Sequence, residues 1–449
     1  MNAMMNSAME VIKILSAHGD AYIVGGAVRD LVMGKEPDDI DIATNVPMEV
    51  TESLFTTYNI GKNKDFGIVV IKHGMFDFEI SNFRMDSAYS DGRHPDSVEI
   101  IQDAKRDSCR RDFTINALYI DSEGNHVDYH DGINDIKNKI LRTVGDPEER
   151  FAEDYIRMLR CVRFSSRLGF AIEEKTEEAI RKNAHNIVRI APERIMKEIL
   201  KMAEQEGSRF ADAIEAMERV GLLKHIFPEI SILTEKFHCE FQHPEGPTVL
   251  NHIVSALRQS TSTDSTVNMA ILFHDVGKGI THHCDSEGVH HYFGHDKAGV
   301  GIIDGIADRM KWDNDLRDAC KFAAEHHMKF HNLDRMKTKK VLILMSSVHW
   351  DILYKVSEAD EKSRLHLFDA DRWASKVAYI ASMASKFGGV TPMQGLKKIV
   401  NGALIMRIKG IDKPSQKIGE IQDRAIDYII KHDSDLSDVA EIERIIKRS

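Results

Sequence analysis

The sequence predicts an α+β domain at the N-terminus, followed by domains that are entirely helical. Up to Gly145, short segments rich in Val, Ile, Phe and Tyr alternate with glycine and proline turns, as strands do. Beyond Gly145-Asp146-Pro147 the apolar residues recur every three or four positions, as in amphipathic helices. The length of 449 residues is consistent with about three domains, at roughly 150 residues each.

The expected elements fall into a strand-rich part and a helical part. Pro192 stands where a proline suits the first turn of a helix, and Gly221 follows a helix as a C-cap does. Strands are expected at residues 21–24, 39–43, 66–72, 75–83 and 126–129. Helices are expected at residues 151–168, 173–183, 192–204 and 210–220, and helical segments continue to residue 449 around a loop at 410–414. We therefore divide the chain into a head (1–145), a neck and body (146–235), a histidine-rich domain (236–370) and a tail (371–449).

Composition excludes several classes of protein. Hydrophobic residues make up 42% of the chain and charged residues 29%, which excludes a disordered chain. No apolar run reaches the roughly 18–20 residues that span a bilayer, and residues 1–10 do not resemble a signal peptide. The formal charge of −11 argues against non-specific wrapping of nucleic acid but allows a local basic groove. The five cysteines, odd in number and without CxxC spacing, argue against disulfides and a thiolate zinc site, so we expect a cytoplasmic protein.

The first candidate site begins where a predicted strand ends in Gly25-Gly26, shortly before Arg29. A glycine pair that opens a helix lets backbone N–H groups approach a polyphosphate, and Arg29 would add a charged donor. Asp39 and Asp41 project from the same face of a strand, where paired carboxylates are costly unless a cation lies between them. Mg²⁺ suits such a pair together with substrate phosphates. A plain turn and a solvated acidic edge are the alternatives, and the combination of both motifs favours the nucleotide site.

A second motif contains adjacent arginines, Arg110 and Arg111, flanked by acidic residues and followed by an apolar stretch. These arginines form either a surface ion network or a clamp for a triphosphate. Asn116, inside the apolar run, is expected to be a buried hydrogen-bonding anchor.

A third motif spaces Asp154, Arg157 and Arg160 three residues apart, so that on a helix they share one face. They form either a ladder of salt bridges along that helix or a site that reads a nucleobase. Cytosine and adenine present an amino group beside a ring-nitrogen acceptor, which a carboxylate and a guanidinium match. Uracil and guanine present a carbonyl and a protonated ring nitrogen there, so an Asp–Arg pair selects C and A without a template.

In this order, the motifs GGAVRD, Asp39-x-Asp41, RRDFTINAL and EDxxRxLRxxRF resemble those of the class II tRNA nucleotidyltransferases (CCA-adding enzymes) and their bacterial poly(A) polymerase relatives. The resemblance covers about residues 20–230. It implies a polymerase-β-type nucleotidyltransferase head, a tRNA-binding helical neck and body, and a loop at residues 84–98 that takes part in the switch from C to A addition. It assigns catalysis and Mg²⁺ binding to Asp39 and Asp41, triphosphate contacts to Gly25, Gly26, Arg29 and Arg111, and base recognition to Asp154 and Arg157 with Arg160 beside them.

Histidine is concentrated after the predicted body, with 12 of 22 histidines between His238 and His331. Metal binding is the first explanation of such clustering. His252, His274-Asp275 and Asp360 provide imidazole and carboxylate ligands, and we expect the helix to end near Gly277, so that His274 and Asp275 reach one ion. This ligand chemistry suits Mn²⁺, Fe²⁺, Co²⁺, Ni²⁺ or Zn²⁺. Structural histidines are the alternative, and a second metal position would draw on His291, His295, His326 and His327.

The order H…HD…D resembles the HD-domain phosphohydrolases, and its place after a nucleotidyltransferase head is similar to bacterial CCA-adding enzymes that carry such a domain. The resemblance implies metal-dependent phosphatase and 2′,3′-cyclic phosphodiesterase chemistry, with a metal-polarised water as nucleophile. Lys278 is either a partner of the phosphate or a partner of a helix C-terminus. The implied ligand set is His252, His274, Asp275, His295, His327 and Asp360, in which we favour His327 over the adjacent His326.

The leading hypothesis is addition of C, C and A to tRNA 3′ ends from CTP and ATP, with release of pyrophosphate, together with HD-domain phosphohydrolysis. An A-only enzyme, a CC-adding enzyme and a poly(A) polymerase are the alternatives within the class. An HD hydrolase whose head only docks RNA is another alternative. We expect Mg²⁺ at the head and Ni²⁺, Mn²⁺, Co²⁺ or Fe²⁺ at the HD site, with tRNA, CTP and ATP as partners of a monomer or homodimer and no membrane contact.

Overall fold

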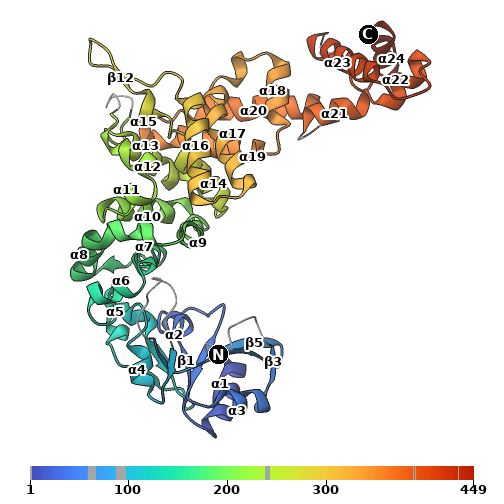
Figure 1. The fold of residues 1–449 in the computed structure, drawn as a ribbon. Helices are drawn as coiled ribbons and strands as arrows, with labels where there is room; N and C mark the ends of the chain where they lie inside the picture. Colours follow the sequence, from blue (N-terminus) through green and yellow to red (C-terminus); the bar gives the residue numbers. More distant parts are fainter. Residues whose placement is uncertain are drawn as a thin grey trace. The chain divides into compact units, whose positions relative to one another are not determined.

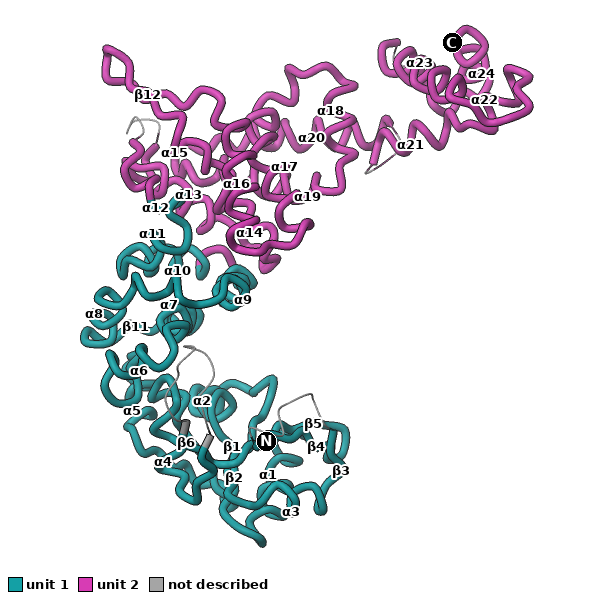
Figure 2. Tube along the Cα trace, viewed as in Figure 1, with its two compact units in different colours: residues 1–205, 209–231 teal, residues 206–208, 232–449 magenta. Residues whose placement is uncertain are grey.

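The chain divides into two compact units, which Figure 2 shows in different colours. The first unit comprises residues 1–205 and 209–231, and the second comprises residues 206–208 and 232–449. The computed structural model describes residues 3–58, 67–86, 98–237, 243–387, 389, 391–432 and 434–449. Residues 87–97 of the predicted switch loop therefore lie outside the described residues, as does Cys239.

A seven-stranded mixed sheet forms the centre of the head, in the order β3-β4-β5-β2-β1-β8-β9. Strands β1, β3 and β5 of this sheet are labelled in Figure 1. Within it β1 is antiparallel to both β2 and β8, whereas β2 and β5 run parallel. The strands are β1 (Ala21–Val24), β2 (Asp41–Thr44), β3 (Thr56–Tyr58), β4 (Ile68–His73), β5 (Phe76–Asn82), β8 (Leu118–Ile120) and β9 (His126–Asp128). The five strands expected from the sequence are all present, with ends that differ by up to two residues, and the α+β prediction is confirmed.

Short helices and two-stranded pairs complete the head. The first helix buries Met5, Ala8, Ile12 and Leu15, which recur at helical spacing. The helices are α1 (Ala3–Ser16), α2 (Gly26–Val32), α3 (Met48–Leu54), α4 (Ala104–Ser108) and α5 (Gly132–Asn138). The paired strands are β6 (Arg84–Asp86) with β7 (Val98–Ile100), and β10 (Ile140–Leu141) with β11 (Ala171–Ile172).

The neck and body are helical, as predicted, but one expected helix is broken. Residues 151–168 were expected to be continuous, whereas the chain is extended at Asp154 (φ −152°, ψ 105°). The break occurs because the Asp154 carboxylate accepts a hydrogen bond from the backbone N–H of Ile156, which begins the next helix. The helices are α6 (Pro147–Glu153), α7 (Ile156–Leu168), α8 (Glu174–Asn183), α9 (Pro192–Ala203), α10 (Gly207–Arg219), α11 (Leu223–Ile226) and α12 (Pro228–Ser231).

The histidine-rich domain is a helical bundle in which α13, α14 and α17 all pack against α19. The helix that precedes His274 ends at Phe273, as expected, but Gly277 is not the residue that ends it, because its φ is −62°. A side chain at Gly277 would meet the carbonyl oxygen of His295 at 2.0 Å, so glycine permits the close approach of α16. The helices are α13 (Val249–Gln259), α14 (Ser265–Phe273), α15 (Lys278–Thr281), α16 (His295–Met310), α17 (Asn314–Phe330), α18 (Thr338–Met345), α19 (Trp350–Ser363) and α20 (Ala370–Lys386), with a hairpin of β12 (His283–Cys284) and β13 (His290–His291).

The tail shares an apolar core with α18 (Thr338–Met345), in which Leu342 is buried together with Leu396, Ile405, Ile426 and Ile445. Its helices are α21 (Pro392–Ile399), α22 (Gly402–Lys409), α23 (Gln416–His432) and α24 (Val439–Arg448). The loop expected at residues 410–414 is confirmed between α22 and α23. In the described part of the chain, no helix combines the length and the apolar character needed to cross a membrane.

Candidate active sites

An open pocket of about 810 Å³ in the first unit brings together eight of the nine residues expected at the nucleotide site; we call it the head pocket. It contains residues from the turn after β1, the start of β2, helix α2, the segment that precedes β8 and helices α7 and α9. The eight residues are Gly25, Gly26, Arg29, Asp41, Arg111, Asp154, Arg157 and Arg160. Asp39 is exposed, precedes β2 and is not part of the lining.

Three carboxylates gather near the start of β2. Asp41 is the first residue of that strand, and Glu79 is its partner across the parallel ladder with β5. Burial raises the pKa of Asp41 to about 6, and the nearby Glu79 and Asp39 add to the rise, although the side chain still faces solvent. A cation would relieve this repulsion, so the oxygen ligands fit Mg²⁺. Sequence reasoning missed Glu79; acidic residues alternate with Phe and Ile along residues 76–80, which is the signal that marks its face of the strand.

The glycine turn at the pocket matches the expectation from the sequence. Gly25 separates β1 from α2 and has φ +76°, a conformation that favours glycine. Gly25 also lies next to Arg111: a Cβ added to Gly25 would lie only 3.3 Å from a guanidinium nitrogen of that arginine, so a larger residue would crowd it.

Arg29 is buried rather than free in the pocket. Its guanidinium donates to the side-chain oxygen of Asn116 at 2.7 Å and forms an ion pair with Asp30 at 2.8 Å. Asn116 in turn donates to Asp112 at 3.1 Å, so the predicted role of Asn116 as a buried anchor is confirmed. Arg29 therefore lies at the pocket wall with its orientation fixed by hydrogen bonds.

Arg111 is also held in place before any substrate binds. It donates to the hydroxyl of Tyr119 at 3.0 Å and pairs with Asp107 at 3.4 Å. Burial alone would raise the pKa of Asp107, but Arg110 and Arg111 hold it below its usual range, so the pair is charged. Arg111 is therefore compatible with both interpretations of the arginine motif, because it belongs to an ion network and also lines the pocket.

The motif of Asp154, Arg157 and Arg160 is not a salt-bridge ladder along one helix. Asp154 lies outside the helix and pairs with Arg194 of α9 at 2.7 Å. Arg160 pairs with Asp112 at 2.6 Å, a partner 48 residues away. All of these side chains line the head pocket, and Arg194 and Asp112 are contributors that sequence reasoning missed, because their partners are distant in the chain.

A smaller pocket of about 320 Å³ in the second unit contains His252, Asp275, His327 and Asp360; we call it the HD pocket. His274 and His295 do not line the pocket, but both are buried and contact Asp275. The structure therefore brings together all six of the expected ligands.

Asp275 is the centre of this cluster. One of its oxygens lies 3.3 Å from His274 Nε2 and 3.6 Å from His252 Nε2. Its other oxygen lies 3.4 Å from His295 Nε2 and 3.5 Å from His327 Nε2. These contacts define two groups of potential metal ligands that share Asp275, as expected for a carboxylate that bridges two metal positions.

Two buried atoms of the cluster fit a metal ion. Within the described part of the chain, neither His274 Nε2 nor Asp275 Oδ1 has a hydrogen-bond partner, although both atoms are buried. Lys278 pairs with the other oxygen of Asp275 at 2.7 Å. Burial alone would raise the pKa of Asp275, but Lys278 and His274 hold it well below its usual range, so it is a carboxylate. Burying such polar atoms without a hydrogen-bond partner costs free energy, and coordination of a divalent cation would offset that cost.

The histidines are oriented by their second ring nitrogens. Nδ1 of His274, His295 and His327 lies 2.7–2.8 Å from the backbone oxygens of residues 271, 292 and 324, respectively. A backbone oxygen only accepts, so Nδ1 carries the proton and Nε2 is left as the ligand atom. Burial also lowers the pKa of His327, which favours the neutral form that binds metal.

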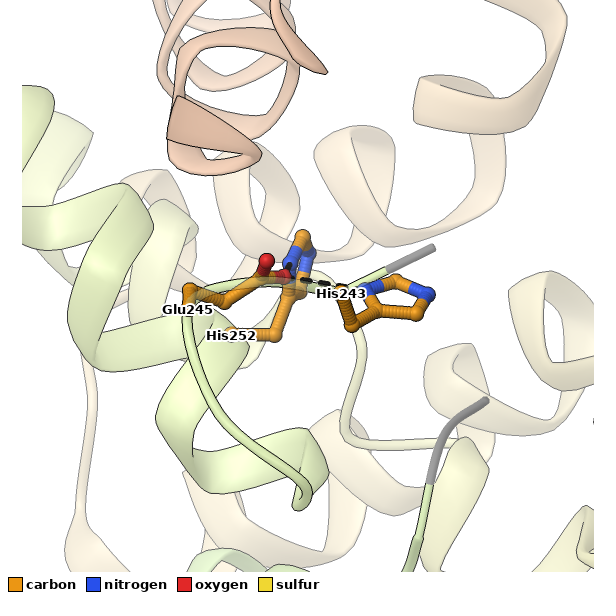
Figure 3. Close-up of side chains that lie close together, drawn as sticks. All are labelled: His243, Glu245 and His252. Carbon is orange, nitrogen blue, oxygen red and sulfur yellow. Dashed lines mark hydrogen bonds and ion pairs between the residues drawn. The ribbon is translucent and has the colours of Figure 1, made fainter. Parts of the chain in front are cut away.

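His252 is oriented by a carboxylate instead, and Figure 3 shows this arrangement. Glu245 lies 2.9 Å from Nδ1 of His252 and 2.9 Å from Nδ1 of His243. His252 Nε2 then faces Asp360 at 3.0 Å. Burial alone would lower the pKa of His252, but the hydrogen bonds to Asp360 and Glu245 outweigh it and raise the pKa to about 9. Glu245 was not among the predicted site residues, because no local pattern of the sequence indicates its contact with His252, seven residues further along the chain.

His326 and His291 lie outside the cluster. His326 Nδ1 contacts Lys329 at 3.0 Å, and its ring packs on Phe322. His291 pairs with Asp285 in the β12–β13 hairpin at 2.8 Å. The structure thus brings His327 rather than His326 to Asp275, and His295 rather than His291. Lys278 begins α15 and pairs with Asp275, so it is not a partner of a helix C-terminus.

Three regions of the chain match known families. Residues 21–142 match the poly A polymerase head domain, and residues 169–233 match the family described as "Probable RNA and SrmB- binding site of polymerase A". Residues 248–348 match the HD domain. The chain therefore carries regions similar to a poly A polymerase head domain, to its RNA-binding region and to an HD domain, in that order. The chain is also similar to proteins named as CCA-adding enzymes.

Individual relatives support this grouping. The CCA-adding enzyme of Lactobacillus helveticus is 45% identical over 205 residues, which are 45% of this chain and 51% of that protein. The chain thus spans about half the length of the curated relatives it matches.

Solved structures show that the fold is shared along the whole chain. The CCA-adding enzyme of Bacillus stearothermophilus, solved in complex with CTP, has a TM-score of 0.69 at 22% identity, covering 100% of this chain and 98% of that one. The Thermotoga maritima enzyme, solved with tRNA, has a TM-score of 0.61 at 18% identity, covering 99% and 95%.

Proposed function

We propose that this protein adds C, C and A to the 3′ ends of tRNA, using CTP and ATP and releasing pyrophosphate. The observation that carries the proposal is the head pocket, in which Asp41 shares one space with Arg111, Asp154 and Arg157. Relatives named as CCA-adding enzymes, one of them solved with CTP and another with tRNA, support it. We place this activity in the cytoplasm, where these substrates are present.

Several groups of the head pocket, together with the nearby Asp39, would have a task in this reaction. The 3′-hydroxyl oxygen of the tRNA forms a bond to the α-phosphorus, the bond from that phosphorus to pyrophosphate breaks, and the hydroxyl loses its proton. Asp39 and Asp41 would hold Mg²⁺, which lowers the pKa of the attacking hydroxyl and neutralises the leaving pyrophosphate. Arg111 lies ready to donate to the triphosphate beside the Gly25 turn. Because Arg111 is already fixed by its partners, little ordering is needed when the nucleotide binds.

Asp154 and Arg157 would select the nucleotide. A carboxylate oxygen of Asp154 accepts from the amino group of cytosine or adenine, and Arg157 donates to the neighbouring ring nitrogen. Arg194 pairs with Asp154 at 2.7 Å and so fixes the orientation of the carboxylate. Uracil and guanine would leave both groups without partners, which explains selection without a template.

The decisive experiment supplies the protein with Mg²⁺, a tRNA that ends at its discriminator base, and CTP and ATP singly or together. Three added nucleotides only with both substrates would establish CCA addition. Addition of C alone or A alone would identify a partial enzyme, and long A tails would identify a poly(A) polymerase. No extension would reject the proposal. Asp41→Asn tests the site, with Asp38→Asn as the control, because Asp38 is an exposed carboxylate outside the pocket.

We also propose that the HD pocket is a metal-dependent phosphohydrolase site with phosphatase and 2′,3′-cyclic phosphodiesterase activity. The bare, buried atoms of His274 and Asp275 carry this proposal. A divalent transition metal, among Ni²⁺, Mn²⁺, Co²⁺ and Fe²⁺, would supply an activated water and polarise the phosphate. During hydrolysis a bond forms between the water oxygen and phosphorus, a bond from phosphorus to a ribose oxygen breaks, and that oxygen gains the proton. Lys278 keeps Asp275 ionised throughout.

Hydrolysis of 2′,3′-cyclic AMP and of a 3′-phosphomonoester tests the HD proposal directly. We expect activity in the wild-type chain supplied with each metal in turn, and loss in His274→Ala. His283→Ala is the control, since His283 is exposed on the β12–β13 hairpin outside the pocket. An HD pocket that binds no transition metal would reject the assignment.

A further inference from the structure

Two arginines of the HD pocket have no charged partner. Arg364 follows α19 and Arg372 lies in the first turn of α20, and both line the pocket. Within the described residues, neither guanidinium forms an ion pair or donates a hydrogen bond. The Nε atom of Arg364 is even buried without a hydrogen-bond partner. A buried donor without an acceptor costs free energy, which an acceptor group of a ligand bound in the pocket would recover.

The acidic groups of the pocket are not available to these arginines. Asp275 pairs with Lys278 at 2.7 Å. Asp360 and Glu361 each contact His331, at 2.9 Å in both cases. Every carboxylate that lines the pocket therefore has a cationic or hydrogen-bonding partner of its own. Arg364 and the more exposed Arg372 therefore line the same pocket without an acidic partner, so an anionic ligand would complement their charges.

The chemistry of the pair favours a phosphate group. Guanidinium groups bind phosphate through two parallel hydrogen bonds, and arginine predominates where that geometry matters. The reacting phosphate would be held at the His–Asp cluster around Asp275, where the bare atoms gather. The pocket of about 320 Å³ matches the lower limit of small-ligand sites, roughly 300 Å³, which suits a single nucleotide.

We propose that Arg364 and Arg372 form an anion subsite that binds a second, non-reacting phosphate of the HD substrate. This inference rests on the proposed phosphohydrolase function and narrows its substrate class. The preferred substrate is then a nucleotide with phosphates on both sides of the ribose, which is the chemistry of an RNA 3′ end. A free mononucleotide with only the reacting phosphate leaves the subsite empty and is hydrolysed less efficiently.

The test uses the whole 449-residue chain and compares two substrates. These are adenosine 2′,3′-cyclic phosphate with a 5′-phosphate and the same compound without it. For the doubly phosphorylated substrate, we expect Arg364→Ala to lower kcat/KM about 10- to 100-fold, mostly through KM, because a charge-assisted hydrogen bond is lost. For the singly phosphorylated substrate, the change should stay within about twofold. Arg372→Ala should behave in the same way with a smaller effect, since its side chain is exposed. Arg335→Ala, an exposed arginine outside the pocket, is the matched control.

Calorimetric binding of the same two nucleotides separates this inference from the hydrolase proposal. The wild-type chain should bind the 5′-phosphorylated form more tightly than Arg364→Ala does, whether or not it hydrolyses either nucleotide. Binding at the head pocket contributes equally to both proteins and cancels in the comparison. Equal loss on both substrates would assign the arginines to the reacting phosphate and overturn the proposal. Unchanged binding and hydrolysis would also overturn it, whereas selective binding without hydrolysis would reject only the phosphohydrolase activity.

Discussion

The head pocket and the HD pocket distribute charge in opposite ways. In the head pocket the arginines are already paired, Arg111 with Asp107 and Arg160 with Asp112, whereas Asp41 is an exposed residue whose nearest charged neighbours include the carboxylates of Glu79 and Asp39. Exposed carboxylates suit Mg²⁺, which keeps part of its water shell and binds together with substrate phosphates.

In the HD pocket the carboxylates are buried and the arginines lack partners. Asp275 and Asp360 are surrounded by imidazoles and a lysine, while Arg364 and Arg372 stand without acids. Buried imidazole and carboxylate ligands suit a resident transition metal. If the proposed functions hold, the head would receive Mg²⁺ together with the nucleotide, whereas the HD domain would retain a resident metal.

The largest effect is expected when one carboxylate is removed from the head. We expect Asp41→Asn to lower nucleotide incorporation about 1,000-fold, because the substitution removes a metal-binding charge at the reacting phosphate. Transition-metal content and HD hydrolysis should be unchanged. Incorporation measured with radiolabelled CTP and metal analysis check both statements, and a parallel loss of both activities would contradict the separation of the two sites.

The converse test removes the centre of the HD cluster. Asp275→Asn should eliminate tightly bound transition metal and lower HD hydrolysis at least about 100-fold, since one carboxylate contacts both groups of histidines. CCA addition should remain within about twofold of the wild type. Elemental analysis of the dialysed protein measures the first effect. Metal content equal to the wild type would show that the cluster is structural.

A milder change tests the orientation of one ligand. Glu245→Gln keeps the shape of the side chain but removes the charge that holds Nδ1 of His252. We expect the metal affinity to fall about 10- to 100-fold. Competition with a chelator measures the affinity, and Glu287→Gln, an exposed residue of the hairpin, is the control. Unchanged affinity would mean that backbone packing alone positions His252.

The smallest effect is expected in the head, at the residue that supports base selection. Arg194→Ala removes the partner of Asp154 and should weaken discrimination of CTP against UTP about 10-fold, which is the usual value of one charge-assisted hydrogen bond. Arg181→Ala, an exposed arginine of α8, serves as the control. Single-nucleotide incorporation with each triphosphate measures the ratio, and an unchanged ratio would leave Asp154 aimed by the helix break alone.

Local patterns allowed much of this architecture to be predicted. The Gly25 turn, the helix that begins with Pro192 and the end of α14 before His274 follow from residues adjacent in the chain. The helix break at Asp154 did not follow, because a single side-chain hydrogen bond to the next N–H outweighed a strong helical periodicity.

The sequence by itself determined which chemical groups are present and in what order: the glycine turn, the two aspartates of the head, the arginine motifs and the H…HD…D series. These are local patterns, and their spacing reflects strands, turns and helix ends. Only the tertiary structure decided how the charges pair: Asp154 with Arg194, Arg160 with Asp112, Glu245 with His252, and Arg364 with no residue of the described chain. The physical reason is that the strength of an ion pair depends on distance and burial, and both are set by packing between segments far apart in sequence.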